Sequence, residues 1–276
     1  MMPEHMARRV RAHVLADPSA VGAYAADIVG RACARAVRAR GVFTLALSGG
    51  STPLHLFRRL REPERMNTGL DWQRVRVFWV DERCVPPEHA NSNFGLAWRE
   101  LFADLPHRPA LFRMRGEEAP EAAARAYERL LYEQARPLGE CASRHHAESA
   151  EGRGGIWPIP RLDCVILGMG ADGHTASLFP GSSALEERTR LTVAASGPAP
   201  GGAPGETIPR LTLTLPVINA ARLCLLMVCG AEKSAVLHRV LDAFSAPTLP
   251  AQQVRPCPGR LVALADRAAW GSESAY

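Results

Sequence analysis

Short runs of almost wholly apolar residues, separated by longer amphipathic segments, constrain the fold of this 276-residue chain most strongly. The clearest runs are residues 42–47, 75–80, 162–167, 223–229 and 261–265. Strands with so few polar residues are typical of sheets that are buried on both faces. Helical patterns lie between them, at 19–40, 53–60, 93–101, 120–134 and 231–243. The alternation predicts an α/β fold, a Rossmann-like three-layer sandwich with a mostly parallel sheet.

The sequence indicates one domain over residues 1–276, because 47% of the residues are hydrophobic and no repeat or linker divides the chain. Alternating residues at 211–215 predict a strand with one wetter face, and 198–209 is a Pro/Gly-rich loop. The stretch 139–160 is rich in Gly, Ser, Arg and His, and we expect a mobile insertion there. An exposed loop explains its three residues of metal-binding types better than a metal site does: Cys141, His145 and His146.

The charge balance and the cysteines narrow the class of protein. A net charge of +5 is modest, and short arginine runs at 8–11 and 58–61 suit solvated helix faces better than nucleic-acid binding. None of the seven cysteines forms a C-x-x-C pair, which fits a reducing compartment. No stretch has the length of a membrane span or the pattern of a signal peptide. We therefore expect a cytoplasmic protein with a small-molecule substrate, without membrane or nucleic-acid partners.

Residues 162–181 carry the strongest chemical signal. An apolar strand there runs into a glycine-rich loop that holds Asp172 and His174, a carboxylate and a titratable ring suited to proton transfer. Gly168, Gly170 and Gly173 also match G-x-G-x-x-G, the dinucleotide-binding pattern. That pattern needs a long helix after the third glycine, which Pro180 interrupts. The segment therefore favours proton transfer over nicotinamide binding.

A second glycine loop follows the first clear strand and predicts a phosphate site. Its glycines free backbone N–H groups at the start of a helix, where Ser51 or Thr52 is expected to cap and the helix dipole favours an anion. An ordinary strand–turn–helix connection is the alternative. Arg83 and Arg210 flank strands that would end at the same crevice, and Lys233 begins a later helix. The predicted phosphate-binding residues are Ser48, Gly49, Gly50, Ser51, Thr52, Arg83, Arg210 and Lys233.

Six motifs occur in an order that resembles the 6-phosphogluconolactonases of the glucosamine-6-phosphate isomerase superfamily. They are S-G-G-S-T-P at 48–53, V-D-E-R at 80–83, G-M-G-A-D-G-H-T-A-S-L-F-P-G at 168–181, R-L-T-L-T-L-P-V-I-N-A-A-R at 210–222, G-A-E-K at 230–233 and L-P-A-Q-Q-V at 249–254. The resemblance implies a fold of the NagB/RpiA/CoA-transferase-like class. It also implies hydrolysis of 6-phosphogluconolactone to 6-phosphogluconate, a step of the oxidative pentose phosphate pathway, without a metal or an organic cofactor.

The resemblance further implies that His174 is the general base, which activates water for attack on the lactone. Either Asp172 or Asp81 would orient its imidazole, and Arg83 is a candidate to stabilise the oxyanion. Deaminases of the superfamily carry a glutamate where Phe179 stands, which argues against isomerisation. A non-catalytic sugar-phosphate sensor would not need His174. The family's lysine before the strand at Arg210 is absent from 205–209, and the sequence leaves monomer and homodimer open.

Overall fold

The computed structural model describes residues 10–62, 70–135, 140–148, 154–242 and 248–271, with the backbone alone for 140–148 and 154–158. Its centre is a seven-stranded sheet in which all neighbouring strands pair in parallel, so the predicted α/β class is confirmed. In spatial order the strands are β1 (Arg11–Leu15), β12 (Arg260–Asp266), β11 (Leu223–Val228), β8 (Cys164–Leu167), β2 (Phe43–Leu47), β3 (Val75–Trp79) and β5 (Ala110–Phe112).

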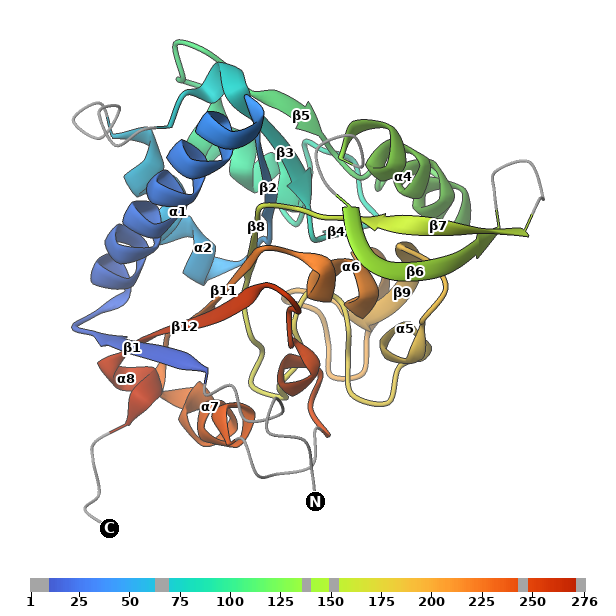
Figure 1. Ribbon diagram of the computed structural model, residues 1–276. Helices are drawn as coiled ribbons and strands as arrows, with labels where there is room; N and C mark the ends of the chain where they lie inside the picture. The colour runs from blue at the N-terminus through green and yellow to red at the C-terminus, as the bar shows by residue number, and fades with distance from the viewer. Residues whose placement is uncertain (1–9, 63–69, 136–139, 149–153, 243–247, 272–276) are drawn as a thin grey trace, which may run out of the picture.

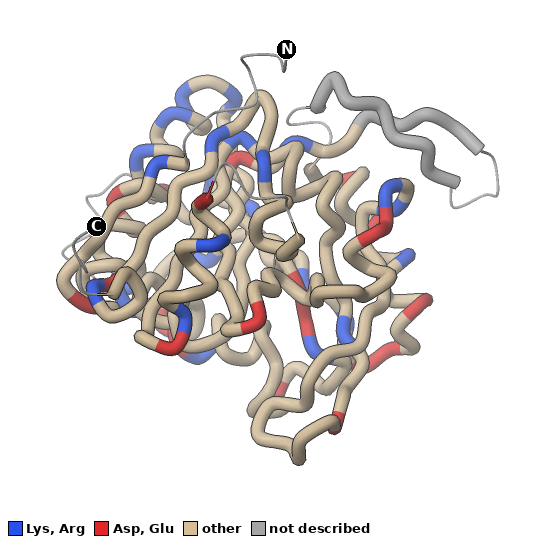
Figure 2. Tube along the Cα trace, turned by 90° about the horizontal axis from the view of Figure 1, so that it is seen from below, with Lys and Arg blue, Asp and Glu red and all other residues tan. Residues whose placement is uncertain are grey.

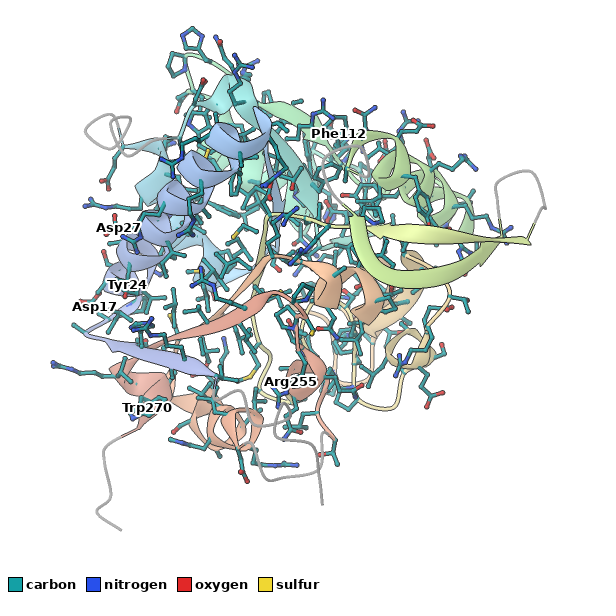
Figure 3. The ribbon with its side chains drawn as sticks, in the orientation of Figure 1. Asp17, Tyr24, Asp27, Phe112, Arg255 and Trp270 are labelled. Carbon is teal, nitrogen blue, oxygen red and sulfur yellow. The ribbon has the colours of Figure 1, made fainter. Side chains whose placement is uncertain are left out.

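Helix α1 (Pro18–Arg40) packs with α2 (Ser51–Arg61) on one side of this sheet, on the left of Figure 1. Asp17 caps α1 by accepting a hydrogen bond from the backbone of Ala20, and Gly41 ends the helix in the left-handed conformation with φ 76°. Tyr24 of α1, labelled in Figure 3, lies against His13 of β1 with ring centroids 4.9 Å apart. This contact attaches the edge strand β1 to the helical layer.

The third layer combines a small antiparallel sheet with helices. That sheet has the order β4 (Asp81–Arg83), β10 (Thr207–Leu213), β9 (Thr192–Pro198), and α4 (Pro120–Gln134) packs against β9, on the right of Figure 1. Leu213 donates its backbone N–H to Val80, which connects the small sheet to the end of β3. The expected wetter face at 211–215 is wrong, because residues of both faces are buried there: Leu211, Thr212, Leu213 and Thr214 are each 0% exposed.

Shorter helices complete the described part of the chain. They are α3 (Asn93–Ala97), α5 (Ser183–Glu186), α6 (Leu215–Ala220), α7 (Ser234–Leu241) and α8 (Arg267–Trp270), with single helical turns at Trp72–Arg74, Ala231–Lys233 and Pro250–Gln253. The helix expected at 93–101 continues beyond α3 as a π-helical turn, Trp98–Phe102. The stretch expected as an insertion carries two antiparallel strands, β6 (Glu140–Glu148) and β7 (Gly154–Pro160). Cys141, His145 and His146 lie in β6, where side chains are outside the described part of the structure.

Basic and acidic residues are interspersed along the trace in Figure 2. Arg58 and Arg61 of α2 pair with Glu100 and Asp104 at N–O distances of 3.1 and 3.3 Å. These exposed pairs fit the solvated helix face that the arginine run at 58–61 predicts. Arg8 and Arg9, in the other run, lie outside the described residues.

The strand order creates a topological switch point between β2 and β8. From β2 the chain proceeds to β3 and β5 on one side, whereas from β8 it proceeds to β11 and β12 on the other. Connections therefore diverge between these two neighbours and leave a crevice at their carboxyl ends, where open α/β sheets bind ligands. The glycine loop at 48–52 follows β2, and the histidine loop at 168–174 follows β8. The two predicted site segments thus border the same crevice.

Candidate active site

The crevice at the switch point is a cleft of about 170 Å³. Seven of the predicted site residues line it: Ser48, Gly49, Asp81, Arg83, His174, Arg210 and Lys233. Gly50, Ser51, Thr52 and Asp172 are not among the lining residues. Asn93, Gly168, Met169, Gly170 and Ala176 also line the cleft, and the sequence analysis did not assign them to the site.

The loop after β8 folds tightly around its glycines. Gly170 donates its N–H to the carbonyl of His174 at 2.9 Å, and Gly173 donates to Gly170 at 3.0 Å. Gly173 has φ +81°, which side chains rarely allow. A Cβ on Gly170 would overlap the imidazole of His174, so this position needs a glycine for close approach rather than for a positive φ. The glycines that resemble a dinucleotide motif serve instead to seat a histidine.

His174 and Asp172 form a hydrogen-bonded pair. Nδ1 of His174 lies 2.5 Å from Oδ1 of Asp172, which also accepts the backbone N–H of His174 at 3.1 Å. Partial burial alone would raise the pKa of Asp172, but its hydrogen bond and ionic contact with His174 lower that pKa below the ordinary value. An ionised Asp172 favours the tautomer with hydrogen on Nδ1, which leaves the Nε2 lone pair to accept a proton. Such an imidazole is suited to general-base chemistry.

Asp81 makes different contacts. It is 6% exposed, and its Oδ2 accepts a hydrogen bond of 2.8 Å from the hydroxyl of Ser177, while Oδ1 lies 3.3 Å from the amide nitrogen of Asn93. Within the described structure, the carboxylate that contacts the imidazole is that of Asp172. The sequence left the orienting role open between these two aspartates, and the geometry favours Asp172.

Two arginines face each other beside this carboxylate. Arg83 on β4 pairs in antiparallel register with Arg210 on β10, so both side chains lie on one face of the small sheet. Arg83 donates through Nη1 to the carbonyl of Asn91 at 2.9 Å, and Arg210 donates through Nη2 to the carbonyl of Pro198 at 2.5 Å. The Nε atoms of both are buried and have no hydrogen-bond partner within the described residues.

The positive charges of Arg83, Arg210 and Lys233 favour an anion in this part of the cleft. Burial lowers the pKa of Arg210 from its ordinary value, and repulsion from Arg83 lowers it further, while Asp81 opposes both effects. Like charges placed directly opposite each other are destabilising unless an opposite charge joins them. Arginine forks match the oxygens of a phosphate well, and Lys233 adds a third cation to the lining.

The loop after β2 leads into helix α2, whose first turn has no side-chain cap. Gly50 is the N-cap of α2 with φ 93°, and no side chain caps this helix. The expected cap by Ser51 or Thr52 is therefore wrong, because the helix begins at Ser51 and both residues lie within its first turn. The first N–H groups of an uncapped helix are available to an anion. Ser48 donates its hydroxyl to the carbonyl of Ile166 at 2.8 Å, which fixes this loop to the neighbouring strand β8.

Asn93 connects the two halves of the cleft and was missed by the sequence analysis. Its Oδ1 accepts a hydrogen bond of 2.5 Å from Nη1 of Arg83, and its Nδ2 donates to the carbonyl of Asp81 at 2.8 Å. A Cβ on Gly49 would overlap the Asn93 amide, so the glycine loop and this side chain pack directly together. A single asparagine in N-S-N-F carries no signal that would reveal this role.

Glu82 holds Asn93 in place. Its carboxylate is 2% exposed and accepts the backbone N–H groups of Asn93 and Phe94 at 2.6 and 2.8 Å. It also accepts the Ser92 hydroxyl at 3.0 Å. This buried carboxylate fixes the start of α3 and thereby the position of Asn93 beside Arg83.

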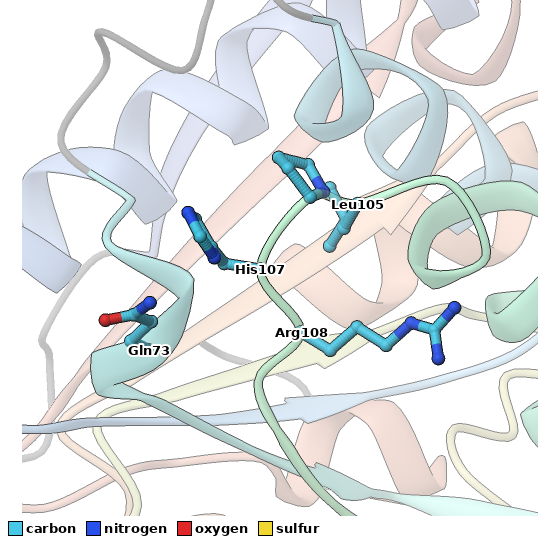
Figure 4. Close-up of a pocket in the computed structure, with 5 residues that line it drawn as sticks. Gln73, Leu105, His107 and Arg108 are labelled. Atoms are coloured by element: carbon cyan, nitrogen blue, oxygen red, sulfur yellow. The ribbon is translucent and has the colours of Figure 1, made fainter.

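A second, more open pocket has a different character. Figure 4 shows its lining by Gln73, Leu105, Pro106, His107 and Arg108, next to the amino ends of β3 and β5. It lies at the opposite end of these strands from the Asp81 cleft and gathers neither an aspartate nor an arginine pair. The described residues contain no group of three His, Cys, Asp or Glu side chains arranged to hold a metal ion. They also contain no helix long and apolar enough to cross a membrane.

Comparison with known proteins identifies relatives of this chain. A family model described as glucosamine-6-phosphate isomerases/6-phosphogluconolactonase matches residues 16–263. A 6-phosphogluconolactonase of Rhizobium meliloti is 40% identical over 225 residues, which cover 82% of this chain and 84% of the relative. The structure of 6-phosphogluconolactonase from Trypanosoma cruzi superposes with a TM-score of 0.78 at 26% identity, covering 99% of this chain and 100% of that one.

A structure of a monomeric glucosamine-6-phosphate deaminase is also similar, with a TM-score of 0.69 at 19% identity, covering 94% of this chain and 98% of that one. At this identity the likeness concerns the fold alone. The family match spans most of the chain, and the relative from Rhizobium meliloti aligns over most of both proteins. The chain therefore belongs to the glucosamine-6-phosphate isomerase/6-phosphogluconolactonase family.

Proposed function

We propose that this protein is a 6-phosphogluconolactonase, which hydrolyses 6-phosphogluconolactone to 6-phosphogluconate. Its relatives at 35–40% identity in Rhizobium meliloti and Rattus norvegicus carry that name. The observation that carries the proposal is one cleft that holds both an imidazole oriented by a carboxylate and a facing pair of arginines. The first group suits ester hydrolysis, and the second suits the phosphate of the substrate.

The phosphate is held at one end of the cleft. Arg83 and Arg210, which line the cleft, bind its oxygens with their guanidinium groups, and the uncapped start of α2 beyond Gly49 and Gly50 supplies backbone N–H groups. Lys233 contributes a further positive charge. Binding at this remote group fixes the lactone carbonyl near His174, so that binding energy is used to orient the reacting atoms.

Water is the nucleophile. Nε2 of His174 removes a proton from water, whose oxygen attacks the lactone carbonyl carbon and forms a tetrahedral oxyanion. Because Arg83 is placed on the phosphate, Lys233 is the cation of the described lining that is left to stabilise that negative charge. The bond between the carbonyl carbon and the ring oxygen then breaks, and His174 returns its proton to the departing oxygen, which becomes a hydroxyl. Asp172 holds the imidazole and stabilises its protonated form between these steps.

Two other functions predict different outcomes. A glucosamine-6-phosphate deaminase would release ammonia and fructose 6-phosphate, but the apolar ring of Phe179 stands where those enzymes carry a glutamate. A sugar-phosphate sensor would bind 6-phosphogluconate without turning over the lactone. We also infer action in the cytoplasm, as a monomer or homodimer. Thiols that form no disulfide support that compartment: Cys33, Cys84, Cys164, Cys224 and Cys229.

The decisive experiment compares the wild type, His174→Ala and buffer alone on freshly prepared 6-phosphogluconolactone, because such lactones also hydrolyse spontaneously. We expect His174→Ala to lower kcat by roughly 10²–10⁴. The matched control is His107→Ala, since His107 is exposed in the remote pocket. Near-normal turnover by His174→Ala would contradict the mechanism, and ammonia release from glucosamine 6-phosphate would favour the deaminase.

A further inference from the structure

Phe179 contacts both the proposed base and a phosphate-binding arginine. Its ring centroid lies 4.5 Å from that of His174, with 40° between the planes, and the guanidinium carbon of Arg210 lies 5.6 Å from the same centroid. Both distances fall within the range in which aromatic rings attract each other and attract cations. One side chain therefore joins the two ends of the cleft.

The ring of Phe179 is closely packed. Its carbonyl accepts hydrogen bonds from the backbone N–H and hydroxyl of Ser182 at 3.1 and 2.8 Å, across a turn in which Gly181 has φ +73°. A Cβ on Gly197 of β9 would overlap ring atoms Cε2 and Cζ, so the far edge of the ring rests on that strand. With 9% of its surface exposed, the ring has little room to reorient.

Each partner of Phe179 has few other restraints on the side of the ring. The hydrogen bond to Asp172 holds Nδ1 of His174 in place. Rotation of the imidazole about that bond is limited only by the side chains that pack against the ring. Arg210 donates to Pro198 through Nη2, and its buried Nε has no hydrogen-bond partner within the described residues. Because Gly197 has no side chain, the ring of Phe179 and Nε of Arg210 can both lie close to its backbone. The ring thus supplies packing that hydrogen bonds do not provide.

We propose that Phe179 is a positioning residue that sets the imidazole of His174 and the guanidinium of Arg210 at a fixed separation, matched to the lactone carbonyl and the phosphate of one substrate. This inference rests on the proposed function. A flexible aliphatic side chain of similar volume would fill the space but would supply neither the flat surface nor the attraction for cations. Both the chemical step and phosphate binding therefore depend on the ring.

The test uses Phe179→Leu, with Phe179→Met as a second variant of similar volume but with an unbranched side chain. We expect kcat on 6-phosphogluconolactone to fall on the order of tenfold, because the base is less well placed. We expect the Kd of 6-phosphogluconate, measured by calorimetry, to rise about threefold to tenfold, because Arg210 loses its aromatic contact. In NMR spectra the ring protons of His174 should lose the ring-current shift that the Phe179 contact produces.

The control is Phe112→Leu. Phe112 (labelled in Figure 3) lies on the edge strand β5 and stacks on Phe78, with centroids 5.1 Å apart. The substitution therefore removes an aromatic contact away from the cleft. Wild-type kcat and Kd are expected for that variant, with thermal melting recorded for all proteins. If the wild type lacks lactone turnover, the proposed function fails, while the calorimetric and NMR measurements still decide whether Phe179 positions the two groups.

A double-mutant cycle separates positioning from general packing. In an Arg210→Gln background, which removes the cation, Phe179→Leu should have a much smaller effect on the Kd of 6-phosphogluconate but should still lower kcat through His174. Folded Phe179→Leu and Phe179→Met proteins with wild-type kcat and Kd would overturn the proposal. An equal loss of affinity with and without the Arg210 substitution would overturn it too, because Phe179 would then not act through Arg210.

Discussion

Gly170→Ala is predicted to disable the proposed base without affecting the phosphate-binding residues. A Cβ built on Gly170 would lie 2.2 Å from ring atoms Cε1 and Nδ1 of His174, whereas ordinary contact begins at 3.4 Å. It would also lie 2.6 Å from Oδ1 of Asp172. The imidazole must therefore move by at least about 1 Å, and a misplacement of that size costs on the order of 10²-fold in rate.

The assay for this prediction is steady-state hydrolysis of 6-phosphogluconolactone, corrected for the spontaneous reaction. We expect kcat to fall about 10²-fold, with KM changed much less, because Arg83 and Arg210 keep their positions. Ala171→Ser is the matched control in the same loop, since Ala171 is exposed and is not among the residues that line the cleft. A Gly170→Ala enzyme with wild-type kcat would refute the reasoning, as would an equal loss in Ala171→Ser.

Three further predictions concern the groups around His174 and the arginines. Asp172→Asn should lower kcat/KM by at least about tenfold, because the imidazole of His174 loses the carboxylate that orients it. The pKa of Asp172 is lowered in the folded state, so this residue stabilises the fold above its unfolded pKa of about 3.8, and that stabilisation is lost as the pH falls. Urea unfolding of the wild type and the variant at neutral and acidic pH checks this. Arg210→Ala should raise KM for 6-phosphogluconolactone at least about tenfold but leave KM for unphosphorylated gluconolactone nearly unchanged; equal losses on both substrates would count against a phosphate contact. Asn93→Ala should raise KM for the phosphorylated lactone about threefold to tenfold, because Arg83 loses its 2.5 Å hydrogen bond; an unchanged KM would remove Asn93 from the site.

The central strands were predictable because burial on both faces leaves a strong pattern. All five residues of β2 are buried, and the corresponding apolar run ends one residue before the glycine loop. Strand β1 was missed, because at the sheet edge its residues are exposed or half-buried and their pattern is not wholly apolar. The wetter face expected at 211–215 failed because a periodicity of two cannot reveal that a further layer covers the polar side.

Site residues were predictable where a loop motif holds them. Asp172 and His174 lie two residues apart, so their contact is local, and the glycines around them mark close approach. Asn93 was not predictable, because its role depends on Arg83, Asp81 and Gly49, which come from other parts of the chain. The N-cap of α2 was placed one or two residues too late, since helix boundaries depend on backbone geometry that composition does not fix.

The central claim is that the imidazole and the arginine pair bind opposite ends of one molecule. A crystal structure of the wild type with 6-phosphogluconate measures this directly. The account predicts phosphate oxygens within hydrogen-bond distance of Arg83 and Arg210, with the carboxylate of the same molecule beside Nε2 of His174. A well-defined ligand whose phosphate lies away from both arginines, or whose carboxylate lies away from His174, would contradict it.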